Sequence, residues 1–432
     1  MVEVKKVCII CFKMVPYADN WGGAQRVFYY ANALTKAGYK VDVMAGRGEK
    51  QFEDRNCDFN RLFFKTPITM SSVSSNRTQV TKKTLKNTIK SYIIKEVKGI
   101  DYSMNNDPDK GMGFFSQLWL VYNWKKIKQQ MIKEMYDYVI ISAPPFGLFM
   151  PLYLKRIKKI TGCKLILDYR DPWNCWNDHK GVSLKREKSA INMADAIVVT
   201  NANHKQKISE DFNYPLDKVF VVMNGYDKQL WNKAEEMYVE QENPDKLIMS
   251  IVGSITLAKS RYRDASKLLR AIDKFSHKDE ILLRVVGTNE LKENIQEIWN
   301  VEIPNFDIVP LVPQIESLKY MLDSDVLINL HTVEDNSSRY LIAGKDFDYY
   351  RSGGLLFSIN SSYSLEHRFI KDNDLGYVAI NTEESIGDVL NQVYEQWISS
   401  KRNLKKRTLP ENDIYSRDYQ NSLWTGIFKQ LS

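Results

Sequence analysis

The sequence predicts an α/β protein built from two doubly wound, Rossmann-like domains. Its 432 residues exceed an average domain, and its 44% hydrophobic and 26% charged residues are close to the globular average. Short runs of Val, Ile and Leu alternate with helical patterns in two successive series, which is typical of parallel sheets covered by helices. The expected strands are 7–12, 40–45, 138–142, 164–168, 196–200 and 219–222, then 247–252, 281–286, 306–309, 326–330 and 355–358.

The change from one series to the next falls in a polar, acidic segment at 226–245, which we expect to be a hinge. The first domain is therefore expected to span 1–225 and the second 246–412. Ligands of doubly wound domains bind at the carboxyl ends of the strands. The cleft between the two domains is the expected active site.

Charge and cysteine content limit the possible partners and the compartment. Lys and Arg number 61 against 53 Asp and Glu, and this net charge of +8 suits anionic partners. A dedicated nucleic-acid binder is usually more basic, so no nucleic acid is expected. Five cysteines without framework spacing do not predict a disulfide scaffold, and the longest apolar stretch, 139–154, contains three prolines. We expect a cytoplasmic protein, or one attached to a membrane only at its surface.

Two glycines lie where a strand of the first domain is followed by a helix. Gly22 and Gly23 precede a helical pattern that ends near Gly38. Glycines let backbone N–H groups approach a phosphate closely, and the helix dipole favours the anion. A tight strand-to-helix turn is the alternative explanation.

The second domain carries cations at the corresponding place. Its first strand ends at Gly253, and the loop that follows contains Lys259, Arg261 and Arg263. Three cations at the carboxyl end of a strand suit a diphosphate, although basic loops are also common on surfaces.

Two further charged clusters lie next to strands, one before a strand of the second domain and one at the end of a strand of the first. Lys345 and Asp348 lie on a short predicted helix, and the Asp348 carboxylate is suited to accept hydrogen bonds from ribose hydroxyls. The alternative is an exposed Lys/Asp pair. A strand of the first domain ends in Asp168, Arg170, Asp171 and Trp173, a charged cluster that favours a site, with a structural ion pair as the alternative.

No metal site is expected. The five histidines form no pair at ligand spacing. Two D-x-D sequences, 107–109 and 346–348, are interpreted as chance occurrences because no other carboxylates lie close to them in sequence.

Positive charge is concentrated at 61–98, where nine basic residues stand against one acid. A basic helix is expected there, and aromatic residues from Trp119 onward are followed by more lysines. Such patterns suit an anionic membrane surface. An amphipathic helix packed on its own domain explains them equally well. The residues assigned to this acceptor or membrane region are Lys82, Lys83, Lys86, Lys90 and Trp119.

The order of motifs resembles the GT-B glycosyltransferases of glycosyltransferase family 4, in the subgroup with an RDPW-like sequence. The motifs in chain order are PxxxxWGGAQR, SAPP, DYRDPW, ADAIVVTNA, VMNGYD, VGSI, RVVG, DVLINL and GKDFDYYRSGG. Nearly the whole chain is covered. Two positions depart from the family, since Ser254 stands where many members have Arg and Tyr340 replaces the first acid of the E-x7-E motif.

The resemblance implies a GT-B fold whose C-terminal stretch, 413–432, packs back on the first domain. It further implies that the second domain binds a nucleotide-sugar and the first an acceptor. By position, it assigns the donor diphosphate to Gly22, Gly23, Lys259 and Arg263 and the ribose to Asp348. The full set of expected donor-binding residues is Gly22, Gly23, Gly253, Lys259, Arg263, Lys345 and Asp348.

The expected function is an enzyme that transfers a hexose-type sugar to an acceptor hydroxyl, with retention, without a metal and without a cofactor. The acceptor is a saccharide or a lipid-linked saccharide, positioned by the expected catalytic residues Asp171 and Arg170. The expected setting is synthesis of a cell-surface polysaccharide, such as a capsule, O-antigen or exopolysaccharide, at the inner face of the membrane. Two alternatives remain: a GT-B-fold sugar-nucleotide epimerase and a non-catalytic glycosyltransferase-like subunit.

Overall fold

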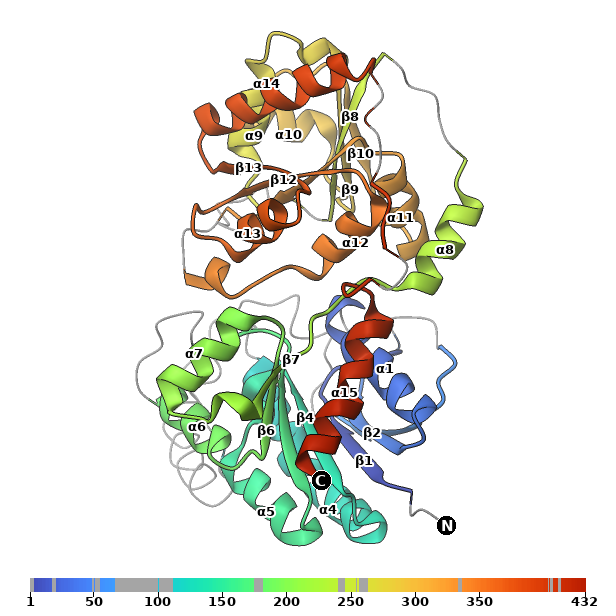
Figure 1. Ribbon diagram of the computed structural model, residues 1–432, viewed down its shortest axis with the longest axis vertical. Helices are drawn as coiled ribbons and strands as arrows, with labels where there is room; N and C mark the ends of the chain where they lie inside the picture. The colour runs from blue at the N-terminus through green and yellow to red at the C-terminus, as the bar shows by residue number, and fades with distance from the viewer. Residues whose placement is uncertain are drawn as a thin grey trace, which may run out of the picture. The chain divides into compact units, whose positions relative to one another are not determined.

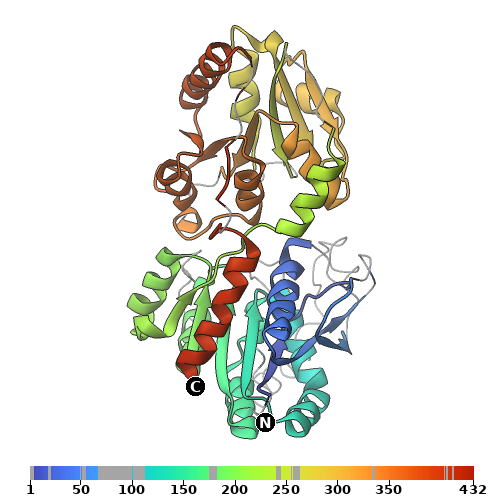
Figure 2. The same cartoon turned by 45° about the vertical axis from the view of Figure 1, so that its right-hand side comes forward.

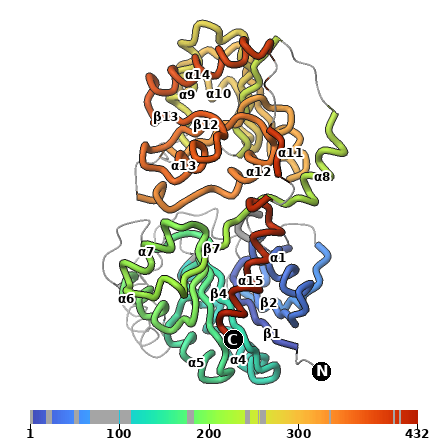
Figure 3. The backbone as a smooth tube through the Cα atoms, in the orientation of Figure 1, coloured from blue at the N-terminus to red at the C-terminus, as the bar shows by residue number. Residues whose placement is uncertain are grey.

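The protein consists of two compact units in a computed structural model (Figure 1). Unit 1 is Met1–Met223 with Gln420–Ser432, and unit 2 is Asn224–Tyr419. The structure describes residues 4–17, 21–48, 50, 55–66, 100, 112–174, 182–239, 245–253, 255, 263–332, 336–402, 404, 407–410 and 413–432. The backbone leaves unit 1 after Met223 and returns to it at Gln420, as the tube in Figure 3 traces.

Unit 1 is a parallel sheet of seven strands in the order β3-β2-β1-β4-β5-β6-β7. The strands are β1 Lys6–Ile10, β2 Lys40–Arg47, β3 Asn60–Lys65, β4 Tyr138–Ala143, β5 Lys164–Tyr169, β6 Ala196–Val199 and β7 Val219–Val221. The helices are α1 Trp21–Lys36, α4 Met112–Glu134, α5 Pro151–Thr161, α6 Val182–Ile191, α7 Ala202–Phe212 and α15 Arg417–Leu431, with 3₁₀ turns η2 Phe146–Leu148 and η4 Leu216–Lys218.

Hydrophobic cores cover both faces of this sheet. In β1, Cys8 and Ile10 belong to the core formed with α4 and α5, whereas Val7 and Ile9 belong to the core formed with α1 and α15. Alternate residues of a strand point to opposite faces, so a strand buried on both faces is apolar throughout. This is why the runs of Val, Ile and Leu in the sequence predicted where these strands lie.

The last helix completes one of the two cores. In α15, Trp424 is fully buried and its ring lies 4.7 Å from that of Tyr30 in α1. Phe428 stacks on Tyr138 at 4.2 Å. The two helices therefore lie side by side on one face of the sheet (Figures 1 and 2).

Unit 2 is a parallel sheet of six strands in the order β10-β9-β8-β11-β12-β13, around a core of its own. The strands are β8 Leu247–Val252, β9 Ile281–Val286, β10 Phe306–Val309, β11 Val326–Leu330, β12 Leu355–Asn360 and β13 Gly376–Ile380. The helices are α8 Lys228–Met237, α9 Ser266–Asp273, α10 Lys292–Trp299, α11 Gln314–Leu322, α12 Gly344–Ser352, α13 Leu365–Asp372 and α14 Glu383–Ser399, with 3₁₀ turns η5 Lys278–Glu280 and η6 Asn336–Arg339.

The predicted fold class of two doubly wound α/β domains is confirmed. The segment expected as a hinge differs, because it contains helix α8, which belongs to unit 2. Asp227 caps this helix by accepting a hydrogen bond from the Leu230 N–H at 3.0 Å, and Trp231 is fully buried. The N-cap and the buried indole stabilise α8, a helix that the polar sequence of this segment did not predict.

The assignment of Trp119 to a membrane-contacting region is wrong. Its side chain is fully buried in the core of unit 1, where the ring packs against Phe12 at 5.9 Å. The indole N–H donates to the carbonyl of Phe64 at 3.1 Å. Lys82, Lys83, Lys86 and Lys90 lie outside the described residues. Within the described ranges, no helix is long and apolar enough to cross a bilayer.

The contacts of α15 predict that Trp424→Ala lowers the free energy of unfolding of unit 1 by about 3–5 kcal/mol, the usual cost of removing a buried aromatic side chain. Lys429→Ala, at an exposed position of the same helix, is the matched control and should change stability little. Denaturant unfolding of both variants measures the difference. Equal stabilities would contradict the packing described for this helix.

Candidate functional site

Polar residues gather where three neighbouring strands of unit 2 end. Strands β8, β11 and β12 are adjacent in the sheet and parallel, so their carboxyl ends lie at one edge. Gly253 follows β8, Asn329 lies in the last part of β11, and Asn360 ends β12. In doubly wound sheets this edge is where ligands bind.

Gly253 and Arg263 lie close together at the end of β8. Gly253 has a φ of +126°, which favours glycine, and its N–H donates to the carbonyl of Val286 at 2.7 Å. A Cβ atom at this glycine would lie 3.7 Å from Nη1 of Arg263. The guanidinium group therefore lies beside the glycine. Lys259 and Arg261 lie outside the described residues.

Lys345 brings a second cation to the same edge. Its Nζ is buried and makes no hydrogen bond with the described residues. Burial, and then the charge of Arg263, lower the pKa of this ammonium to about 8, while Asp346 and Glu366 oppose the shift. A buried ammonium without an acceptor is costly, so an anion placed against it would supply the missing partner.

Helix α12 holds Lys345 at this position through Tyr349, which lies one turn further along. The Tyr349 hydroxyl donates to the carbonyl of Val252 at 3.1 Å and accepts from the N–H of the same residue at 2.9 Å. The Lys345 Nζ lies 5.4 Å from the centre of the Tyr349 ring. Residues four apart share one face of a helix, so this clamp also turns Lys345 toward the strand end.

Two buried carboxylates flank the ammonium. Asp346 accepts from the Ala343 N–H at 2.9 Å and from Nδ2 of Asn329 at 2.5 Å. Burial, with a further contribution from Glu366, raises the pKa of Asp346 well above its ordinary range. Glu366 accepts from Nδ2 of Asn360 at 3.5 Å, and burial raises its pKa as well. The edge thus concentrates ionisable groups whose pKa values are perturbed, which is common at functional sites.

Asp348 has different neighbours from Asp346. Its Oδ1 accepts from the indole N–H of Trp231 at 2.9 Å. Burial raises the pKa of Asp348 to about 6, and Arg417 opposes that shift. The hydrogen-bond partners of Asp346 and Asp348 are therefore distinct.

A buried ion pair organises the corresponding edge of unit 1. Arg26 Nη2 lies 2.9 Å from Oδ1 of Asp168, whose Oδ2 accepts from the Ser142 hydroxyl at 2.8 Å. Arg26 Nη1 also donates to the carbonyls of Val222 and Met223 at 2.9 and 3.3 Å. These bonds join α1 to the ends of β4, β5 and β7. Asp168 belongs to the charged cluster predicted at the end of β5, with a structural ion pair as the alternative, whereas Arg26 was not predicted as a site residue.

The predicted residues of unit 1 occupy the ends of the expected elements. Gly22 and Gly23 are in the first turn of α1. Arg170 follows β5, and its N–H donates to the carbonyl of Ala143 at 2.8 Å. Its Nε lies 3.4 Å from Oδ2 of Asp171, a long contact between sequence neighbours.

Two consecutive residues of α6 hold the loops beside Arg170. Arg186 donates to the carbonyls of Phe149 and Gly147 at 3.1 and 3.2 Å. Glu187, which is buried, accepts from Nδ2 of Asn174 and from its backbone N–H, and burial raises the pKa of this carboxyl to about 7. These residues fix the segments that follow β4 and β5. Their spacing along the sequence gave no indication of this role.

This fold is that of the GT-B proteins. The chain is similar, at 14% identity, to a glycosyltransferase from Rickettsia africae ESF-5, with a TM-score of 0.53 over 100% of this chain and 95% of that one. The Anabaena protein Alr3699/HepE in complex with UDP gives a TM-score of 0.56 at 11% identity, covering 99% and 98% of the two chains. A Listeria monocytogenes protein assigned as a UDP-N-acetylglucosamine 2-epimerase gives a TM-score of 0.53 at 9% identity, covering 99% of this chain and 96% of that one. The sequence matches no family model and no curated protein.

The raised pKa of Asp348 predicts a pH-dependent effect of Asp348→Asn. Because the folded pKa of about 6 lies above the ordinary value of 3.8, ionisation of this group costs stability as pH rises through that range. At pH 8 the substitution should raise the free energy of unfolding by about 2 kcal/mol, since one pKa unit corresponds to about 1.4 kcal/mol and the carboxyl is partly exposed.

The same comparison at pH 4.5 should give a much smaller difference between Asp348→Asn and the unmodified protein, as followed by denaturant unfolding. Asp388→Asn, at an exposed position of unit 2, serves as the control and should have no effect at either pH. A variant that is no more stable than the unmodified protein at pH 8 would contradict the burial of this carboxylate.

Proposed function

We propose that the protein is a glycosyltransferase that moves a sugar from a nucleotide-sugar donor to an acceptor hydroxyl. The observation that carries the proposal is the buried Nζ of Lys345, which has no acceptor among the described residues and lies at the carboxyl edge of unit 2 with Arg263. The diphosphate of the donor would give the Lys345 Nζ an acceptor and place its negative charge close to Arg263. The GT-B fold shared with a protein solved with UDP supports this choice.

In this proposal the site stabilises the departing nucleoside diphosphate. Negative charge grows on the leaving group as the glycosidic bond of the donor breaks, and preorganised cations away from water are effective at that point. Lys345 and Arg263 supply two such charges, and Gly253 leaves room for the backbone to approach. We therefore propose transfer without a metal, with retention at the sugar carbon.

The ribose of the donor is assigned to Asp348 in the same proposal. The indole N–H of Trp231 already donates a hydrogen bond to Oδ1 of this carboxylate, so the ribose hydroxyls would donate to Oδ2. A carboxylate whose pKa is raised by burial lowers the free energy of unfolding when it ionises near neutral pH. Groups that are retained at such a cost are typical of binding sites.

Unit 1 would bind the acceptor. Arg170 and Asp171 follow β5 at the carboxyl edge, held by the loops that Arg186 and Glu187 fix, and we propose that they position the acceptor hydroxyl. A hexose as the transferred sugar and a saccharide or lipid-linked saccharide as the acceptor complete the proposal. It places the reaction in cell-surface polysaccharide synthesis at the cytoplasmic face of the membrane.

A sugar-nucleotide epimerase is the second candidate, because a protein assigned to that activity shares the fold at a TM-score of 0.53. An epimerase needs no acceptor. Conversion of a nucleotide-sugar to its epimer in the absence of any acceptor would favour this candidate over the transferase.

The transferase proposal predicts that a nucleoside diphosphate sugar raises the melting temperature of the full chain. A ligand at 100 times its Kd adds about 2.7 kcal/mol to stability. The probes are the uridine, guanosine, adenosine and thymidine diphosphate sugars. Lys345→Met should weaken binding of the active probe by about 10- to 100-fold, because a hydrogen bond to a charged group is lost.

Lys233→Ala, which removes an exposed lysine of α8, is the matched control and should leave affinity unchanged. Isothermal titration calorimetry gives the dissociation constants. Unchanged affinity in Lys345→Met would remove this residue from the site. Binding of none of the four probes would favour a non-catalytic subunit over both enzymes.

A further inference from the structure

Unit 1 has a pocket of about 450 Å³ that the proposed reaction does not use. Its lining comes from the beginnings of β2 and β3 and from the last turn of α4. It therefore lies at the amino edge of the sheet, whereas Asp168 and Arg170 lie at the carboxyl edge. A pocket of this volume is large enough for a small ligand.

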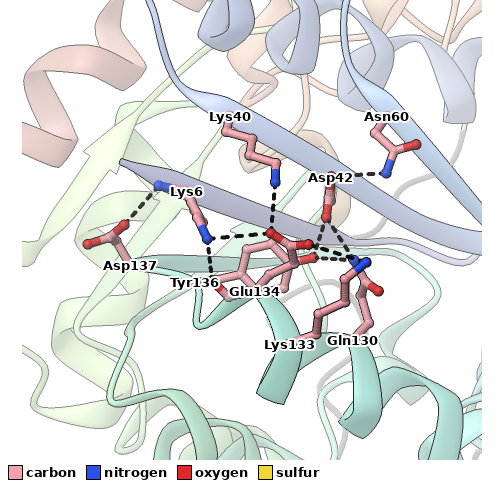
Figure 4. A network of polar contacts seen from close by, with 9 residues as sticks. All are labelled: Lys6, Lys40, Asp42, Asn60, Gln130, Lys133, Glu134, Tyr136 and Asp137. Atoms are coloured by element: carbon pink, nitrogen blue, oxygen red, sulfur yellow. Dashed lines mark hydrogen bonds and ion pairs between the residues drawn. The ribbon is translucent and has the colours of Figure 1, made fainter. Parts of the chain in front are cut away.

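Uncharged donors surround a buried carboxylate of this pocket, Asp42, which is 1% exposed. The Tyr136 hydroxyl donates to its Oδ2 at 2.5 Å, and Nε2 of Gln130 donates to the same oxygen at 3.2 Å. Nδ2 of Asn60 donates to Oδ1 at 3.1 Å (Figure 4). The side-chain amides of Asn60 and Gln130 are thereby oriented at the pocket wall.

A second carboxylate, Glu134, is neutralised by lysines. Its Oε2 accepts from Lys40 at 2.8 Å and from Lys6 at 3.5 Å, and Lys133 lies 3.8 Å from Oε1 (Figure 4). The lysines lower the pKa of Glu134. Positive and negative groups are therefore nearly balanced at this edge.

The remaining lining offers both polar and apolar contacts. Asp58 is exposed at the pocket, and its carboxylate accepts no hydrogen bond from the described residues. Tyr39 and Leu62 are half-buried and give the wall an apolar part. A ligand at this place would meet carboxylate oxygens, amide groups, an ammonium and an apolar surface together.

We propose that this pocket binds an uncharged saccharide of one or two sugar units. Sugar hydroxyls both donate and accept, which matches the mixed groups of Asp58, Asn60 and Gln130. Leu62, which packs toward the core that contains α4, offers an apolar contact to the C–H face of a sugar ring. A phosphate would meet the carboxylates of Asp42 and Asp58, because the lysines of this pocket already contact Glu134. A metal cation would compete with those lysines for Glu134. This inference does not rest on the proposed transferase activity.

The test measures binding of maltose, cellobiose and lactose to the full chain by saturation-transfer difference NMR, with and without UDP. At least one disaccharide should bind in the presence of UDP, and Asp58→Ala and Gln130→Ala should each weaken it by about 5- to 10-fold, the loss expected for one hydrogen bond. Gln206→Ala, on an exposed part of α7, is the control and should leave the affinity unchanged.

Three results would overturn the inference. The first is that none of the disaccharides binds. The second is that binding is unaffected by Asp58→Ala, which changes an exposed side chain and leaves the core intact. The third is that glucose 6-phosphate binds at the pocket while all three neutral sugars do not. Loss of nucleotide binding in Lys345→Met, with the disaccharide still bound, would leave the inference standing and separates it from the donor site.

Discussion

The removal of Lys345 from water is the constraint around which the edge of unit 2 is organised. An ammonium buried without an acceptor is unfavourable, so the surrounding structure has to hold it in place. The two hydrogen bonds between Tyr349 and Val252 do this by fixing α12 against β8. Burial raises the pKa values of Asp346 and Glu366, whose charges act on this ammonium. We propose that an external anion supplies the acceptor that the Lys345 Nζ lacks among the described residues.

Unit 1 also buries charged side chains, but there the two charges are paired with each other. Arg26 and Asp168 are both buried, but each is paired with the other and with further hydrogen bonds to Ser142 and to backbone carbonyls. A buried pair that is fully bonded fixes geometry, and removal of one partner would leave an uncompensated charge. We interpret the Arg26–Asp168 pair as structural, and it is the Lys345 edge that we propose as the donor-binding site.

The sequence was sufficient for the fold because its strands are buried on both faces. Apolar runs identified the central strands in both units, but β3, NRLFFK, and β13, GYVAI, were missed because edge strands are only partly buried and carry polar or glycine residues. Trp119 was misplaced because an aromatic residue beside lysines has the same local pattern in a core as at a membrane surface.

Candidate site residues were predictable where a glycine or a cation follows a strand, as for Gly253 and Arg263, which lie close together in the structure. Lys345 was predicted from its place on a short helix before a strand, and its charge interacts with that of Arg263. Glu366 was missed because it comes from another helix, 21 positions after Lys345, and contacts the site only once β12 and α13 are in place. Arg26 and Asp168 are separated by 142 residues, so no local pattern connects them.

Hydrogen exchange with and without UDP, followed by mass spectrometry, tests most directly whether the carboxyl edge of unit 2 binds a nucleoside diphosphate. Binding at Gly253, Arg263 and Lys345 predicts slower exchange in peptides that cover the end of β8, the end of β11 and helix α12. Peptides from unit 1 should change much less. Protection confined to unit 1, or no protection at saturating UDP, would contradict the account.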